Sequence, residues 1–304
     1  MKCRSVLLLP ATCACTMVFF AQQPPQQLTD EQRQKVDAAL PKKAPAKPRK
    51  ARRMLVTNLA KVGDRLVRGH PSIPAANYAI EEMGKRTGAY EAFFSNDVEM
   101  FRADKLKDFD AVCFNNSQGV LFEEPELRKS LLDFVTGGHG LIGYHAVIAT
   151  FVQHPVYDQW PVFGRMVGGT ENGGHPWMPT DTFTFKVDDG KSPLNAVFQG
   201  KGFEVTDEVM QLQEPDLRSR FHVLLSIDMN TTKPPSHKLL PVREQDKDFP
   251  LTWIREEGKG RVFISGMGHN PNVFWVPELL EHFLAGMQYA LGDLKADAAL
   301  EKRR

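Results

Sequence analysis

One stretch, Gly137 to Ala146, constrains the fold of this chain more than any other. An amphipathic segment, Glu124 to Val135, runs into the pair Gly137-Gly138, which is typical of the carboxyl end of a helix. The apolar run Leu141–Gly143 then predicts a buried strand, which a tight turn at Gly143-Tyr144-His145 closes. Ligands of open parallel α/β sheets bind where strands end, so His145 occupies a position suited to chemistry.

The same strand–helix alternation recurs along residues 54 to 292. Strands are predicted at Met54–Asn58, Tyr90–Ser95, Asp110–Asn115, Leu141–Gly143, Thr182–Val187, Val209–Leu212, His222–Ile227, Leu251–Ile254 and Arg261–Ser265. Helices are predicted from Ile73 to Arg86 with Ser72 as N-cap, at Glu124–Val135, at Tyr157–Met166, and from Pro277 to Gly292. Because the first strands are apolar throughout, we expect an α/β fold with a parallel sheet covered on both faces. The middle strands are expected to extend this sheet and not to form a second domain.

The two ends of the chain differ in composition from the expected domain. Residues 1 to 21 begin with positive charge and continue as a short apolar run, which predicts a signal peptide and export to the periplasm or beyond the cell. An uncleaved anchor is the alternative; in the mature chain we expect no transmembrane span. Residues 22 to 53 are rich in Gln, Pro and Lys, which predicts an extended, disordered linker. Residues 293 to 304 form a charged tail that we expect to fray.

Charge and cysteine content narrow the chemistry of the domain. Residues 54 to 304 carry 27 Lys and Arg against 34 Asp and Glu, a net charge of −7, which argues against nucleic acid as a partner. Three of the four cysteines (Cys3, Cys13, Cys15) lie in the expected signal peptide. Cys113 is flanked by apolar neighbours in a predicted strand, so we expect a buried structural thiol and not a nucleophile.

Several polar side chains follow the predicted strands. His145 and His269 each stand at a strand end beside glycine, and His70 lies in the loop after the first strand. His175 and Glu208 could reach the same sheet edge from surrounding loops, where residues distant in sequence would share one pocket. Single loop histidines are usually structural or lie at the surface, which is our expectation for His139, His154, His222, His237 and His282.

Imidazoles with one carboxylate suit a divalent metal such as zinc, with His145, His175, Glu208 and His269 as its ligands. Without a metal, His145, His269 and Glu208 could act as catalytic acid and base groups. The sequence has no G-x-S-x-G nucleophile turn, no G-x-G-x-x-G after the first strand and no P-loop motif, so the signatures of dinucleotide and P-loop sites are missing and no nucleotide cofactor is expected.

Several pieces in order resemble the ThuA-like (trehalose utilisation) family. They are Arg68-Gly69-His70-Pro71-Ser72-Ile73-Pro74, Phe114-Asn115-Asn116-Ser117, Gly138 to Ala146, Gly168-Gly169 with His175-Pro176, Asp207-Glu208, and Gly258 to Phe263 leading to Gly268-His269. The resemblance implies a flavodoxin-like, class I glutamine amidotransferase-like three-layer sandwich with a mainly parallel sheet. The nucleophilic cysteine of the amidotransferases is absent, and His145 stands at the matching elbow. One departure is that no acidic-Thr pair follows Ala146.

The resemblance also implies a role in carbohydrate metabolism, particularly of trehalose and related disaccharides through 3-keto intermediates. We therefore expect an exported enzyme that acts on a (keto-)disaccharide or related sugar; the reaction stays open between a sugar hydrolase, lyase and isomerase. It is not expected to be a glutamine amidotransferase. Substrate-binding side chains are expected at His70, Asn115, Asn116, Ser117 and, less typically for a strand residue, Trp253. The alternative is a non-catalytic carbohydrate-binding or scaffold domain, and a homo-oligomer is left open.

Overall fold

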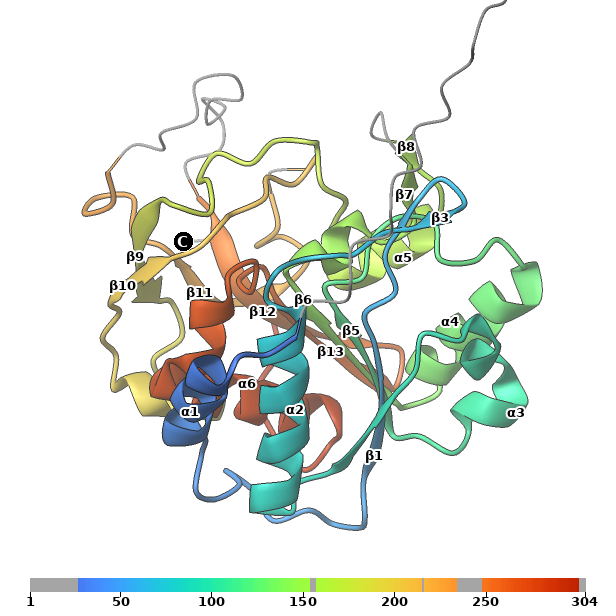
Figure 1. The fold of residues 1–304 in the computed structure, drawn as a ribbon, viewed down its shortest axis with the longest axis horizontal. Coiled ribbons are helices and arrows are strands. Elements are labelled where there is room, and N and C mark those ends of the chain that lie inside the picture. The colour runs from blue at the N-terminus through green and yellow to red at the C-terminus, as the bar shows by residue number, and fades with distance from the viewer. Residues whose placement is uncertain (1–26, 154–156, 215, 234–247, 301–304) are drawn as a thin grey trace, which may run out of the picture.

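The computed structural model describes residues 27–153, 157–214, 216–233 and 248–300 (Figure 1). The expected signal peptide with its three cysteines lies outside these residues, as do His154 and His237. A nine-stranded sheet runs through the molecule in the order β10-β9-β11-β12-β13-β6-β5-β1-β4. The strands of this sheet are β1 (Arg53–Thr57), β4 (Glu91–Phe94), β5 (Ala111–Asn115), β6 (Gly140–Tyr144), β9 (Thr182–Val187), β10 (Glu204–Thr206), β11 (His222–Ile227), β12 (Pro250–Glu257) and β13 (Gly260–Ser265).

Helices lie on both faces of this sheet. They are α1 (Asp30–Ala39), α2 (Ile73–Thr87), α3 (Ala103–Leu106), α4 (Pro125–Thr136), α5 (Pro161–Val167) and α6 (Pro277–Ala290), with 3-10 turns η1 (Val98–Phe101), η2 (His145–Ala149), η3 (Pro193–Phe198) and η4 (Pro271–Trp275). Two small hairpins pair β2 (Lys61–Val62) with β3 (Arg65–Leu66) and β7 (Val152–Gln153) with β8 (Tyr157–Asp158). Within the described residues, no helix combines the length and apolar character needed to cross a bilayer.

The strands β4, β1, β5, β6 and β13 pair in parallel and form the part of the sheet that the sequence predicts best. Along β5, Val112 and Phe114 pack into one hydrophobic core while Cys113 packs into the other. Helices α1, α2 and α6 cover the face of Cys113, and α3, α4 and α5 cover the opposite face (Figure 1). The predicted α/β class and covered parallel sheet are therefore confirmed. Burial also raises the pKa of the Cys113 thiol, as suits a structural cysteine.

The strands β12, β11, β9 and β10 extend the same sheet in antiparallel fashion, as expected for added strands. The prediction of a strand over Val209–Leu212 is wrong, because this segment forms only two isolated bridges. Helix α5 also begins later than predicted, at Pro161. A proline lacks the N–H that a helix interior needs but is compatible with the first turn, so the helix can begin there.

From residue 27 on, the segment before β1 corrects the prediction of a disordered linker over residues 22 to 53, whose first five residues lie outside the described part of the chain. Helix α1 begins with a reciprocal capping box between Thr29 and Gln32 and buries Val36 and Ala39. After the helix, the Ala46 main chain exchanges hydrogen bonds of 2.8 and 2.6 Å with the Gln288 amide. Ordering is possible because this segment uses the body of the domain, and not a core of its own, to satisfy its polar groups.

The charged tail from residue 293 is likewise docked where the structure describes it. Asp293 is buried and accepts from the guanidinium of Arg52 at 2.7 and 3.0 Å and from the Arg49 N–H at 3.0 Å. The Ala299 carbonyl accepts from His222 Nδ1 at 2.7 Å, so the expectation of a frayed tail is wrong as far as residue 300. Paired charges and satisfied carbonyls explain why a polar tail can pack.

His282 is a structural histidine, as expected from the sequence. It is fully buried in α6, where Nδ1 donates to the Leu194 carbonyl at 2.9 Å and Nε2 accepts from the Thr252 hydroxyl at 3.1 Å. Burial lowers its pKa to about 4, so the ring is neutral at physiological pH.

Candidate functional site

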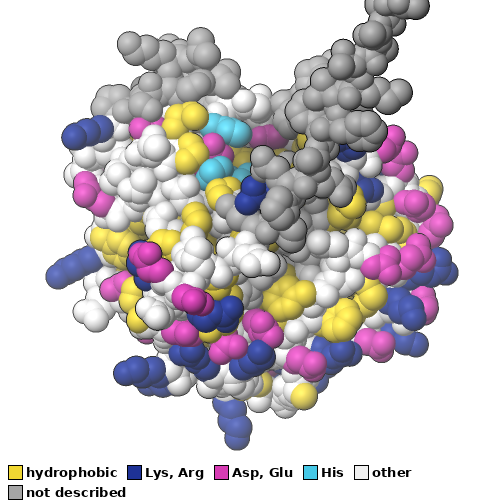
Figure 2. All heavy atoms as spheres, in the orientation of Figure 1, with side chains coloured by type: hydrophobic (Ala, Val, Ile, Leu, Met, Phe, Trp, Pro, Cys, Tyr) yellow, Lys and Arg dark blue, Asp and Glu magenta, His cyan; other side chains and the backbone are white. Residues whose placement is uncertain are grey.

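Four side chains from distant parts of the chain meet at the carboxyl edge of the parallel strands. His145 follows β6, His269 follows β13, His70 lies in the loop before α2, and Glu208 follows β10. Each offers one ligand atom, and these atoms all lie within 4.8 Å of one another. Figure 2 shows histidine side chains gathered at this end of the molecule. The structure thus brings together four of the residues singled out from the sequence.

The three imidazole rings are packed edge to face. Their centroids are 4.9, 5.1 and 5.2 Å apart, and the interplanar angles lie between 80° and 88°. In this arrangement each ring contributes one nitrogen atom to the group of ligand atoms within 4.8 Å of one another. We refer to His70, His145, Glu208 and His269 as the four-residue cluster.

The turn that carries His145 is strained. His145 has a φ of +43°, in the left-handed region that side chains other than glycine rarely adopt. Two residues earlier, a Cβ on Gly143 would lie 2.7 Å from both γ-carbons of Val147, so the chain can turn this sharply only with glycine there. Asn116, at the end of the neighbouring strand β5, has a φ of +56°. Such strain costs about 1 to 3 kcal/mol per residue and is concentrated at functional sites.

Hydrogen bonds fix the tautomers of two of the histidines. His145 Nδ1 lies 3.1 Å from the Gly266 carbonyl, which can only accept, so Nδ1 carries a hydrogen. His269 Nδ1 lies 3.1 Å from Asn270 Oδ1. The Asn270 amide nitrogen already donates to the Pro179 and Thr206 carbonyls at 2.6 and 3.1 Å, so its oxygen faces the ring and accepts. In the neutral state both histidines therefore present the Nε2 lone pair.

These Nε2 atoms face a carboxylate. His145 Nε2 lies 3.3 Å and His269 Nε2 3.9 Å from the same oxygen, Oε2 of Glu208. Burial alone would raise the pKa of Glu208, but His145 and His175 outweigh burial and lower it below its usual value. A lone pair opposite a carboxylate oxygen is repulsive unless a positive charge lies between them, either a proton on the ring or a bound cation.

His70 completes the cluster as a neutral ring. Burial and the neighbouring His145 and His269 lower its pKa to about 2. Its Nδ1 is buried and has no hydrogen-bond partner among the described residues. An orphaned buried nitrogen is uncommon, and here it belongs to a ring whose neighbours are all potential metal ligands.

His175, expected as a metal ligand, lies beside the cluster and is not one of its four members. Its Nδ1 is 3.3 Å from Glu208 Oε1, and its Nε2 is 3.4 Å from Glu171 Oε2. The hydrogen bonds to Glu171 and Glu208 raise the pKa of His175 to about 9. With a side chain 34% exposed, His175 forms a charged, solvent-accessible border of the site.

The residues expected to hold substrate hydroxyls are buried and engaged with the protein. Asn115 donates to Asn77 Oδ1 at 2.8 Å, and Ser117 donates to the Thr57 carbonyl at 3.1 Å. Asn116 donates to the Gly268 carbonyl at 3.2 Å, next to His269. All three from Asn115 to Ser117 have no exposed surface, and their contact with substrate stays a prediction.

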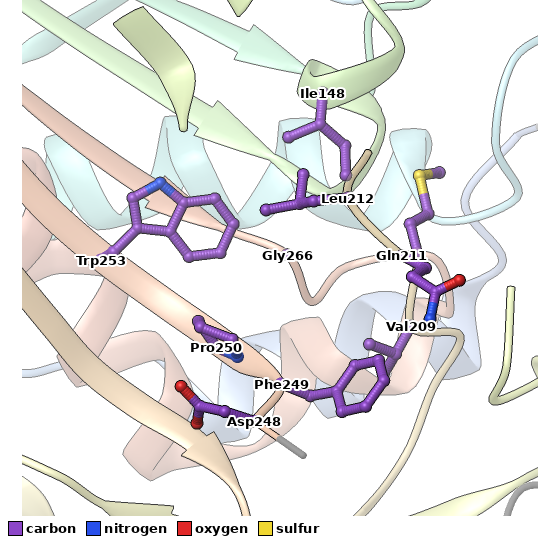
Figure 3. A pocket seen from close by; sticks show the side chains of 10 residues that line it. Ile148, Val209, Gln211, Leu212, Asp248, Phe249, Pro250, Trp253 and Gly266 are labelled. Carbon is purple, nitrogen blue, oxygen red and sulfur yellow. The ribbon is translucent and has the colours of Figure 1, made fainter. Parts of the chain in front are cut away.

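Trp253 is buried in the domain core. Only 2% of it is exposed, and its Nε1 donates to the Val167 carbonyl at 2.9 Å. Its ring lines a small, mostly apolar pocket with Ile148, Leu212 and Phe249 (Figure 3). The burial of this ring agrees with the usual core role of a strand Trp, and substrate binding by Trp253 stays a prediction.

Four supporting residues escaped the sequence analysis as parts of a site: Ser72, Glu171, Asp207 and Asn270. Ser72 was predicted as an N-cap, but its side chain makes no capping bond and instead donates to the Gly268 carbonyl at 2.6 Å. Asp207 is fully buried and accepts from two backbone N–H groups beside His269. Burial raises its pKa, and the charges of the neighbouring histidines and these hydrogen bonds oppose the rise. Its place in the pair Asp207-Glu208, one of the pieces that carry the family resemblance, was the signal that the sequence offered.

The donor set of the cluster fits a divalent cation. Three imidazoles and a carboxylate are typical zinc ligands, and two of the imidazoles have their tautomer fixed by outer hydrogen bonds, as metal-binding histidines usually do. Ligand atoms around a tetrahedral zinc ion are about 3.4 Å apart. The separation of His145 Nε2 from Glu208 Oε2 matches this value. The widest pair would have to close by about 1.4 Å on binding.

Comparisons with known proteins agree with this picture of the fold. The family model described as trehalose utilisation, ThuA, matches residues 62–290. A ThuA-like protein from Bacteroides uniformis superposes with a TM-score of 0.59 at 20% identity over 79% of this chain and 93% of its own. One from Parabacteroides merdae gives a TM-score of 0.53 at 15% identity over 83% and 93%. A search of curated proteins finds no significant match. With the family model covering most of its length, the chain belongs to the ThuA, trehalose utilisation, family.

Proposed function

We propose that this protein is an exported, metal-dependent enzyme of carbohydrate metabolism that acts on a keto-disaccharide or a related sugar. The observation that carries the proposal is the convergence of three imidazoles and one carboxylate on one space, with two Nε2 lone pairs facing the carboxylate. Membership of the trehalose utilisation family supports a carbohydrate substrate. Export rests on residues 1 to 21 alone, and amino-terminal sequencing of the mature protein tests it.

In this proposal His70, His145, Glu208 and His269 hold a divalent ion such as zinc. When bound, such an ion supplies a Lewis acid toward a carbonyl oxygen, which a keto-sugar provides. The rings need little preparation, because His70 is already neutral and His145 and His269 already present Nε2. The pre-set tautomers reduce the rearrangement that binding would require.

His175 is suited to proton transfer in the proposed reaction. Each of its nitrogens faces a carboxylate oxygen, Glu208 on one side and Glu171 on the other, so both nitrogens carry hydrogens. A group at the border of the cluster with partial exposure can reach both substrate and solvent. We assign it the role of general acid for the sugar oxygen that gains a proton.

Metal analysis together with a turnover assay tests the proposal. The purified protein, loaded with zinc and dialysed, should retain one equivalent by mass spectrometry, and His145→Ala should retain none. Turnover of trehalose oxidised to its 3-keto form, followed by NMR, should be lost in His145→Ala. His139→Ala is the matched control, because His139 stacks on Phe134 away from the cluster and should change neither readout. Unchanged turnover in folded His145→Ala would refute the proposed role of this residue.

A further inference from the structure

Both carboxylate oxygens of Asp207 accept hydrogen bonds from one short backbone turn. Oδ2 accepts from the Gly268 N–H at 2.7 Å, and Oδ1 accepts from the Asn270 N–H at 2.8 Å. These two N–H groups belong to the residues on either side of His269. The carboxylate has no exposed surface, and no Lys or Arg forms an ion pair with it within the described residues. A buried carboxylate held only by backbone N–H groups is expensive unless it has a specific role.

We infer that Asp207 is the positioning residue that sets His269 in the four-residue cluster, an inference that rests on the proposed metal-binding function. By holding the Met267–Gly268 and His269–Asn270 peptide groups, it limits the directions that the Cα–Cβ bond of His269 can take. Asn270 then fixes the ring, since its oxygen accepts from His269 Nδ1. Glu208, the next residue after Asp207, joins the cluster itself.

The turn that donates hydrogen bonds to Asp207 also accepts hydrogen bonds from two other side chains. The Gly268 carbonyl accepts from the Ser72 hydroxyl at 2.6 Å and from the Asn116 amide at 3.2 Å. Ser72 lies two residues after His70, so the position of the turn is tied to the loop that carries a second member of the cluster. Gly268 has a φ of +125°, which excludes most other residues there.

The Gly266 carbonyl, at the start of the same turn, orients His145. Residues 266 to 270 therefore orient His145 and His269 directly and bind Ser72, two residues after His70. The negative charge of Asp207 acts in the same direction as its geometry, because a buried carboxylate close to the cluster favours positive charge there. Removing one acceptor from this carboxylate should disturb both the placement of His269 and the attraction for a cation.

The variant Asp207→Asn tests the inference, because it keeps the size of the side chain but can accept only one of the two N–H groups. We expect its zinc affinity, measured by competition with a chelator, to fall by about 10- to 100-fold, as is typical for the loss of an outer partner of a metal ligand. The visible spectrum of the cobalt-loaded protein should shift as well. In the metal-free protein, the amide hydrogens of Gly268 and Asn270 should exchange faster than in the wild type.

Asp293→Asn is the matched control, because Asp293 is another buried carboxylate that accepts from a backbone N–H, that of Arg49. It should lower stability and leave zinc affinity within twofold of wild type. Zinc affinity within twofold for folded Asp207→Asn would overturn the inference. If Asp207→Asn does not fold, amide hydrogen exchange of the wild-type protein decides. Slow exchange at Gly268 and Asn270 supports the two hydrogen bonds to Asp207, and fast exchange at either residue overturns the inference.

Failure of the proposed function gives a different pattern. If the wild-type protein binds neither zinc nor cobalt, the proposed metal site is wrong, and only the amide exchange of the metal-free proteins bears on Asp207. Faster exchange at Gly268 and Asn270 in Asp207→Asn then still supports Asp207 as the group that holds the His269 turn. Unchanged exchange overturns that role as well.

Discussion

The elbow at His145 depends on a glycine for steric reasons, and this can be measured. A Cβ on Gly143 would lie 2.7 Å from each γ-carbon of Val147 and 2.8 Å from its Cβ. Val147 is fully buried, so its side chain cannot move into solvent. Gly143→Ala should therefore push η2, and His145 with it, away from the strand end.

The magnitude follows from the contacts. Overpacking of this kind costs about 1 to 3 kcal/mol, and we expect about 2 kcal/mol for Gly143→Ala. Val147→Ala removes two buried methyl groups and should also cost about 2 kcal/mol. In the double variant two of the three close contacts disappear and the new methyl fills part of the cavity. Its cost should be about 3 kcal/mol, which is a coupling free energy of about 1 kcal/mol.

Urea unfolding of the four proteins measures this coupling, and zinc affinity measures the displacement of His145. Gly143→Ala should bind zinc more weakly than the wild type, and adding Val147→Ala should restore part of the affinity. Stability costs that add to within about 0.5 kcal/mol would refute the steric argument. Unaltered zinc affinity in Gly143→Ala would show that the close contact does not set the position of His145.

Three further predictions concern pH, a buried ion pair and metal binding. The folded pKa of His282, about 4, lies below the ordinary value of about 6.5, so unfolding free energy should fall by roughly 3 kcal/mol as pH drops between them. His282→Gln should flatten this slope in urea titrations, and an equal slope would contradict the assignment. Arg52→Met leaves the buried Asp293 without its ion-pair partner and should lower the unfolding free energy by about 2 to 3 kcal/mol in chemical denaturation. Arg53→Met breaks a more exposed ion pair, with Glu91, and should lower it by less than about 0.5 kcal/mol. Zinc at about 100 times its Kd should raise Tm by about 5 to 10 °C by calorimetry, and His269→Ala should abolish the rise; equal shifts would exclude His269 as a ligand.

The parallel part of the sheet was predictable because its strands are apolar on both faces, a pattern that few other structures produce. Helix α1 was not, since the charged residues around it suggested a linker and only Val36 and Ala39 within it are buried. The capping box at Thr29 and Gln32 was the available signal. The late start of α5 likewise had its sign in Pro161.

The histidines of the site were predictable from their place at strand ends, because parallel strands bring their carboxyl ends to one edge. Their supports were not. Ser72 and Gly268 are 196 residues apart, and the bond between them replaces the helix cap that local sequence suggested. Asp207 accepts a hydrogen bond from the backbone N–H of Gly268, 61 residues away. Nearly every residue type has a backbone N–H, so the sequence does not reveal such a bond. Distinguishing His70 from His175 as the fourth member required the loop geometry itself.

Two energetically unfavourable features of the four-residue cluster and its surroundings support the proposed metal site. The backbone at His145 and at Asn116 is strained, and the lone pairs of His145 and His269 face the Glu208 carboxylate. Neither feature improves packing, and each raises the free energy of the folded chain. A proton on the ring or a bound cation relieves the second feature, and the strained turn at His145 carries the ring whose Nε2 faces the carboxylate. A domain that only fills space gains nothing from either feature, and both are among the observations that support the proposed metal site.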